Sequence, residues 1–125
     1  MYTSKYFSLA ETECRCKCGF DLTDDYKQKA DRLREVYGKP LTMSSGARCP
    51  SYNAKVSETG TTGPHTTGNA ADYVVARGDA YLLMGLAFAQ GFSGIGVAQK
   101  GASRFLHLDT LRAGPGQPRP TVWSY

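Results

Sequence analysis

Apolar residues recur at helical spacing in the first long segment of the chain, between residues 23 and 38. They are three or four positions apart, as on the buried face of a helix: Tyr26, Ala30, Leu33 and Tyr37. Thr23 or Asp24 can cap the first turn, and Gly38 ends the helix. Lys27 falls on the polar side of this pattern, so we expect its ammonium group to face solvent.

A second helix is predicted from Ala80 to Gln90, with Asp79 as its N-cap and Gly91 at its end. Its apolar side chains cover most of its circumference, which predicts a helix buried in the core: Tyr81, Leu82, Leu83, Leu86, Phe88 and Ala89. Two shorter helical turns are predicted, one after a possible capping box of Ser8 and Glu11, and one over 51–56.

Short apolar runs bounded by turn residues predict strands at 41–44, 70–75, 95–98 and 104–108. The last two flank a turn at 99–103 and predict a hairpin. Residues 57–68 are almost free of apolar side chains and predict a long loop, and 114–120 are irregular and rich in Gly and Pro. Mixed helices and strands indicate the α+β class.

Length and composition indicate one soluble globular domain spanning residues 1–125. A chain of 125 residues can bury a single core, and 41% hydrophobic with 21% charged residues is ordinary for such a domain. No apolar run approaches the roughly 20 residues of a membrane span, and Met1–Lys5 do not open a signal peptide. We therefore expect a protein that is cytoplasmic when made, or exported by a route it does not encode.

The chain has only two histidines, and each lies beside a carboxylate. His65 is on a loop rich in Gly and Thr, and Asp72 follows seven residues later at a predicted strand. His107 lies mid-strand, where alternation places it on one face with Phe105 and Asp109. Two imidazoles and a carboxylate can hold a catalytic zinc with one open position, so His65, Asp72 and His107 are candidate ligands. Two alternatives remain: packed histidines without metal, or a non-haem iron site.

Four cysteines are present, three of them separated by single residues: Cys14, Cys16 and Cys18, with Cys49 later in the chain. Single-residue spacing matches no common zinc pattern. Alternation would place the first three on one face, within reach of one point. The pattern leaves open a structural metal, one or two disulfides such as Cys16 or Cys18 with Cys49, or reduced thiols packed in a turn.

Several motifs together resemble the M15 peptidases. They are the run Ser44–Pro50 (SSGARCP), Asn53, the spacing from His65 to Asp72, the run Phe105–Asp109 (FLHLD) and Trp123. The resemblance extends from Phe7 to Trp123. It implies a small domain of the hedgehog and DD-peptidase type, with a mostly antiparallel central sheet, helices packed on that sheet and a zinc cleft.

The resemblance also implies an activity. M15 enzymes are zinc metallopeptidases that hydrolyse peptide bonds in peptidoglycan stem peptides, as D-Ala-D-Ala carboxypeptidases or as endopeptidases, including phage endolysins. The net charge of +4 is compatible with an anionic wall surface. We expect stem peptides as the partner, neither nucleic acid nor membrane insertion, and a monomer that acts on the cell wall, as in phage lysis.

By the same resemblance, three residues are assigned to the substrate. Arg48 would hydrogen-bond the scissile carbonyl oxygen as negative charge builds on it. Asn53 would brace Arg48, and Trp123 would cover the cleft or the sheet edge.

This sequence departs from the family pattern at two places. Gly63 stands where family members usually carry Ser, two residues before the first ligand histidine. Positions that hold a general base in several members are Arg104 and Phe105 here. Asp109 is the main remaining candidate, either as base or as a group that orients His107, and Glu58 is a second candidate. The missing base leaves a further alternative, an inactive wall-binding module of the same fold.

Overall fold

The computed structural model describes residues 1–125 and contains one mixed sheet of five strands. The strands are β1 (Thr42–Ser45), β2 (Ala70–Val74), β3 (Gly94–Ala98), β4 (Phe105–Asp109) and β5 (Thr121–Ser124). Their order is β1-β2-β4-β3-β5, and every neighbouring pair is antiparallel except β3 and β5. The prediction of an α+β domain with a mostly antiparallel sheet is confirmed, as is the hairpin of β3 and β4.

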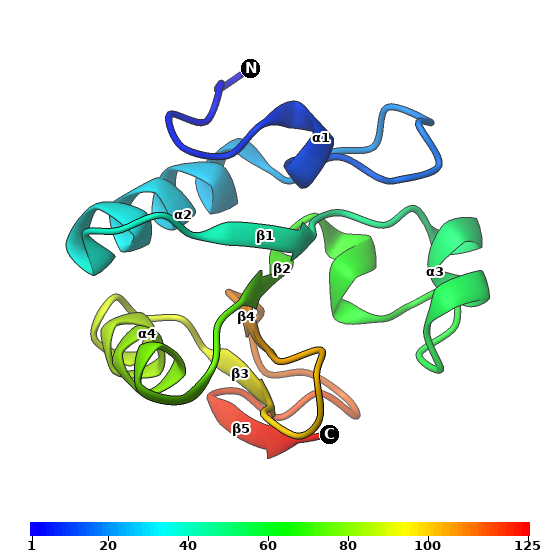
Figure 1. Ribbon diagram of the computed structural model, residues 1–125. Helices are drawn as coiled ribbons and strands as arrows, with labels where there is room; N and C mark the ends of the chain where they lie inside the picture. Colours follow the sequence, from blue (N-terminus) through cyan, green and yellow to red (C-terminus); the bar gives the residue numbers. More distant parts are fainter.

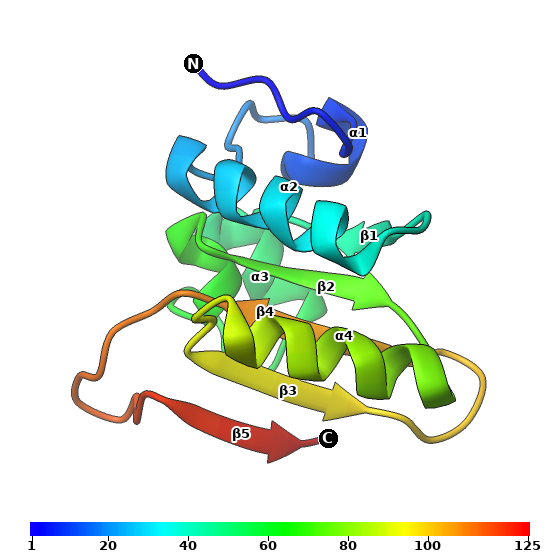
Figure 2. The same cartoon turned by 90° about the vertical axis from the view of Figure 1, so that its left-hand side faces the viewer.

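The helices lie on both sides of this sheet (Figures 1 and 2). They are α1 (Leu9–Thr12), α2 (Asp24–Tyr37), α3 (Pro50–Val56), the 3-10 helix η1 (Pro64–Thr67) and α4 (Arg77–Ala89). Helices α2 and α4 cover one face, whereas α3 and η1 lie on the other. No helix is long and apolar enough to cross a membrane.

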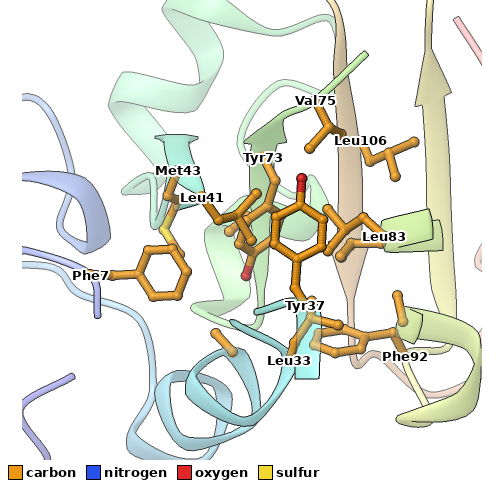
Figure 3. Packing of buried hydrophobic residues seen from close by; sticks show 14 of the residues in the cluster. Phe7, Leu33, Tyr37, Leu41, Met43, Tyr73, Val75, Leu83, Phe92 and Leu106 are labelled. Atoms are coloured by element: carbon orange, nitrogen blue, oxygen red, sulfur yellow. The ribbon is translucent and has the colours of Figure 1, made fainter. Parts of the chain in front are cut away.

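The hydrophobic core fills the space between the sheet and the pair α2 and α4 (Figure 3). Strands β2 and β4 send alternate side chains into it: Ala71, Tyr73, Leu106 and Leu108. Each large apolar side chain buried in this way contributes about 1.5–3 kcal/mol. The intervening residues of β2 and β4 therefore face the opposite side, where α3 and η1 lie.

Helix α2 begins and ends as predicted. Thr23 is the N-cap, and its hydroxyl accepts a hydrogen bond from the Tyr26 amide at 3.2 Å, while Gly38 ends the helix in the left-handed conformation at φ 78°. The expectation for Lys27 was wrong. Its side chain is only 3% exposed and donates to Asp21 at 2.5 Å, because the N-terminal arm packs over this side of the helix.

Helix α4 differs from its prediction at its start and in its burial. It begins at Arg77, so Asp79 lies in the first turn, where its carboxylate binds Lys39 instead of capping the helix. Tyr81 and Phe88 are 80% and 78% exposed. The helix contacts the protein along one side only, through Ala80, Leu83 and Ala87, so an apolar circumference did not mean complete burial.

Helix α1 packs against β1 and the segment that follows it. The capping box of Ser8 and Glu11 is confirmed. The Glu11 carboxylate accepts from the Met43 amide at 2.9 Å, and the Thr12 carbonyl accepts from the Ala47 amide at 3.0 Å. Between these contacts the backbones approach so closely that a Cβ at Gly46 would lie 2.5 Å from the carbonyl oxygens of Glu11 and Thr12.

This close approach predicts that Gly46→Ala destabilises the protein by about 1–3 kcal/mol, because backbone atoms must move to admit the methyl group. Gly85→Ala is the matched control. Position 85 is in α4 with open space around it, so alanine there should be neutral or slightly stabilising. Urea unfolding of both variants measures the difference, and equal unfolding free energies would contradict the packing described for Gly46.

Candidate metal centre

The register of two strands brings the first pair of polar residues together. Asp72 of β2 lies directly opposite His107 of β4, and both point away from the hydrophobic core. His107 Nδ1 is 3.2 Å from Asp72 Oδ1. The third residue, His65, comes from η1, which Gly63 and Pro64 begin and Gly68 ends. Its Nε2 is 3.3 Å from the same Asp72 oxygen.

In each imidazole, the nitrogen that faces away from Asp72 already makes a hydrogen bond. His65 Nδ1 is 2.8 Å from the carbonyl oxygen of Gly46, which can only accept, so this nitrogen carries a hydrogen. His107 Nε2 is 2.7 Å from Asp109 Oδ2 and therefore also donates. In neutral rings, His65 Nε2 and His107 Nδ1 then direct lone pairs at a carboxylate. That donor set fits a cation, and the three side chains can hold a divalent metal ion.

The charges of the site agree with this fit. Burial acts to raise the pKa of Asp72, but His107 and His65, which can donate to it when their rings are protonated, outweigh burial and hold that pKa below its usual value. Burial acts to lower the pKa of His107, whereas hydrogen bonds of the protonated ring to Asp109 and Asp72 raise it, so a proton on Nδ1 takes the place that a metal cation would take. Asp72 is therefore an anion at neutral pH, which a cation at this position would stabilise.

Arg48 lies beside the same carboxylate. Its Nη2 is 3.5 Å from Asp72 Oδ2, its Nε donates to the Ser45 hydroxyl at 3.0 Å, and its Nη1 donates to Asn53 Oδ1 at 3.1 Å. The Arg48 amide also donates to the His65 carbonyl at 3.0 Å. The guanidinium is thus held at the edge of the cleft rather than free in solvent.

Asn53 contacts Arg48 as expected, but a direct contact with substrate does not fit its position. The side chain is fully buried, and its amide donates to Thr59 Oγ1 at 2.8 Å and to the Gly60 carbonyl. A Cβ at Gly63 would overlap the Thr59 hydroxyl and lie 3.1 Å from Asn53 Nδ2. The Thr59 hydroxyl thus occupies the space that a serine at position 63 would need, which explains how glycine is accommodated there.

Asp109 lies behind the cleft wall and is held by two residues that line the cleft, Arg119 and His107. Its carboxylate is completely buried and accepts from Arg119 Nη2 at 2.8 Å and Nε at 3.0 Å, besides the contact with His107. Burial acts to raise the pKa of Asp109, but hydrogen bonds from His107 and Arg119 lower it to about 2. These contacts favour the orienting role over the role of base. Glu58, the second candidate base, does not line the cleft.

Trp123 lies both at the sheet edge and in the cleft, as part of β5. Its ring centroid is 5.0 Å from that of His107, and the Arg119 guanidinium lies 5.2 Å from its ring centroid. Two glycines of β3 leave room for Trp123 and for the neighbouring Asp109. A Cβ at Gly96 would lie 2.8 Å from the indole, and one at Gly94 would overlap the Asp109 carboxylate.

Sequence reasoning missed Arg119, Gly94 and Gly96. The glycines had a signal, because two glycines one residue apart within a strand indicate a close approach by neighbouring groups. Arg119 lies in a Pro-rich stretch that has no periodic pattern, so its pairing with Asp109 required the structure.

The four cysteines lie together at a separate place, as free thiols. Cys16 Sγ is 3.3 Å from Cys14 Sγ and 3.5 Å from Cys49 Sγ. The structure therefore brings Cys16, Cys18 and Cys49 together as expected but contains no disulfide between them.

These observations define a small α+β protein with a candidate metal site in an open cleft of about 700 Å³. The Peptidase M15 family model matches residues 5–109, and the chain belongs to this family. Peptidases of this family depend on a metal, which agrees with the ligand set described above. No curated protein matches the chain. The match ends at Asp109, so Arg119 and Trp123, which complete the site, lie outside it.

The pairing of Asp109 predicts that Arg119→Ala costs about 3 kcal/mol of unfolding free energy, because it leaves a buried carboxylate without its cation. Arg112→Ala is the control, since Arg112 is exposed and its side chain makes no hydrogen bond or ion pair. Chemical denaturation of both variants measures this. Equal stability of the two would show that Arg119 is not needed to hold Asp109.

Proposed function

We propose that this protein is a zinc metallopeptidase that hydrolyses peptide bonds in peptidoglycan stem peptides. One observation carries the proposal. In a chain of the Peptidase M15 family, His65 Nε2, Asp72 Oδ1 and His107 Nδ1 converge beside Arg48 in an open cleft. Two imidazoles and one carboxylate are the protein ligands of many catalytic zinc sites.

The ion would be held by His65, Asp72 and His107. When bound, it would supply a Lewis acid that can activate water near neutral pH and polarise the carbonyl of the bond to be cut. The protein's own residues prepare the ligands for that ion. Gly46 fixes the tautomer of His65, and Asp109, anchored by Arg119, fixes that of His107.

Arg48 provides a donor for the developing oxyanion. Its position is determined by Ser45 and Asn53, so little reorganisation is needed during the reaction. A preorganised cation at this place can lower the barrier by a few kcal/mol. Trp123 and Phe105 form apolar walls of the cleft and can contact the substrate.

The substrate class rests on the family and on the shape of the cleft. The cleft is open and lined mostly by polar residues, which suits an extended peptide rather than an enclosed small molecule. We propose stem peptides as the partner, cut either at a terminal D-Ala or within the peptide, and action on the bacterial wall, as in phage lysis. The chain would act as a monomer.

A second candidate function is an inactive wall-binding module of the same fold. It is favoured by one observation: Asp72 is the only carboxylate that lines the cleft, and Asp109 is paired with Arg119. A wall-binding module of this kind would have the same cleft and bind the same metal but would not cleave its ligand.

Incubation of the purified protein with cross-linked peptidoglycan fragments distinguishes the two, with mass spectrometry of the products. We expect new peptide termini, no products after chelation, and restored products after zinc is added. Undigested fragments that still bind the protein would favour the wall-binding module. Metal analysis of protein purified without added metal should find zinc, and iron in its place would contradict the hydrolase.

His107→Ala should abolish product formation and remove one divalent ion per chain relative to wild type, because a ligand nitrogen is lost. Metal content and product formation are measured on the same preparation. A variant that retains its full metal content would contradict the ligand assignment.

Arg48→Lys should reduce kcat/KM about a hundredfold, because an ammonium group lacks the forked donors that reach both Asn53 and the oxyanion. Arg32→Lys, on the exposed side of α2, is the control and should leave kcat/KM unchanged. If both variants have wild-type kinetics, Arg48 has no role in turnover.

A further inference from the structure

The four cysteines converge although they come from two distant segments. The sulfurs of Cys14, Cys16, Cys18 and Cys49 all lie within 4.8 Å of one another. Cys16 has the closest neighbours, with Cys14 Sγ at 3.3 Å and Cys49 Sγ at 3.5 Å. Cys14 is buried, whereas Cys16 and Cys18 are exposed, so the cluster lies at the surface with one side closed by the protein.

A tight turn between α1 and α2 explains how three closely spaced cysteines can face one point. The Lys17 amide donates to the Cys14 carbonyl at 3.0 Å, and the Cys14 amide donates to the Phe20 carbonyl at 2.8 Å. Lys17 adopts a left-handed conformation at φ 63°, which reverses the chain between Cys16 and Cys18. A strand-like alternation is therefore not needed, and the unusual single-residue spacing is compatible with a closed cluster.

The second segment is held against this turn. The Cys49 amide donates to Cys14 Sγ at 3.3 Å, and Ala47 pairs with Thr12 just before it. In Figure 1 the turn after α1 lies next to the connection from β1 to α3, which carries Cys49. Cys49 thus completes the cluster from the opposite side.

We propose that Cys14, Cys16, Cys18 and Cys49 form a structural zinc site. Zinc in structural sites takes four ligands in a tetrahedron, and four thiolates are a common set. With zinc–sulfur bonds of about 2.3 Å, neighbouring sulfurs in such a tetrahedron lie about 3.8 Å apart. The sulfur separations of 3.3 and 3.5 Å and the common limit of 4.8 Å bracket this value.

The surroundings favour a metal over the two other possibilities for this cluster, which are disulfides and reduced thiols without metal. A single disulfide would engage two of the four sulfurs and leave the others beside it as free thiols, and exposed thiols are open to oxidation. Two disulfides would use all four, but one of them would have to join two cysteines of the tight turn, whereas all four are free thiols in the structure. A tetrathiolate zinc site uses all four. It carries a charge of −2, and two cations, Arg15 and Lys17, alternate with three of its ligands in the sequence.

This site would position the peptidase residues without touching the substrate. Cys49 directly follows Arg48, and its carbonyl accepts from the amide of Asn53, which in turn holds Arg48. A metal bound at Cys49 would therefore fix the segment that carries Arg48 against the N-terminal arm. The inference does not depend on the catalytic proposal, since the two sites share no ligand.

Metal counting with cobalt as a probe tests the proposal on the full chain, purified under reducing conditions. After loading with zinc, we expect two ions per chain in wild type and one in His107→Ala. Replacement of zinc by cobalt should give the intense near-ultraviolet absorption of cobalt bound to thiolates in both proteins. This absorption reports sulfur ligands alone, so it separates the cysteine site from the His65, Asp72 and His107 site.

Cys16→Ser should lose the thiolate absorption and retain one ion, while the variant Ser103→Ala, at an exposed position away from both sites, should keep both ions. Should Cys16→Ser fail to fold, titration of zinc-loaded wild type with a mercurial reagent replaces it, with release of one zinc per four thiols expected. A wild type that binds one ion and shows no thiolate absorption would overturn the proposal. So would a disulfide among these cysteines, detected by mass spectrometry, in zinc-loaded reduced protein.

Discussion

The candidate site depends on the antiparallel register between β2 and β4. That register places Asp72 opposite His107, and strand alternation directs both away from the core. The same alternation sends Tyr73, Leu106 and Leu108 into the hydrophobic core, so burial of the apolar face fixes the position of the polar face. A shift by one residue would exchange the two faces, so that the ligands would point into the hydrophobic core and the apolar side chains into the cleft. The hydrophobic effect thus determines where the candidate metal ligands lie.

Around these two strands, each ligand is oriented by a partner of its own. The Gly46 carbonyl holds His65, and the pair of Asp109 and Arg119 holds His107. Glycines at 46, 94 and 96 leave room for these partners, because a Cβ at any of them would overlap or crowd a neighbouring group. The geometry of the site therefore depends on glycine at these three positions as well as on the side chains that form the site. Its cysteine cluster would add a second anchor for the segment that carries Arg48.

Much of the fold and the candidate ligands could be predicted from local patterns. The capped helix α2, the β3 and β4 hairpin and the set His65, Asp72 and His107 all had clear signals in adjacent residues. Lys27 and α4 were predicted poorly because burial depends on what packs against a helix, which periodicity does not specify. The pairing of Arg119 with Asp109 joins an irregular tail to a strand. Contacts of that kind depend on the path of the whole chain.

The central claim is that His65, Asp72 and His107 share one zinc ion with an open coordination position. X-ray diffraction from zinc-loaded crystals, measured on both sides of the zinc absorption edge, tests it most directly. The account predicts an anomalous peak that marks a zinc ion bonded to His65 Nε2, an oxygen of Asp72 and His107 Nδ1, with solvent as a further ligand. No peak among these three side chains, or a fourth protein ligand that excludes solvent, would contradict it.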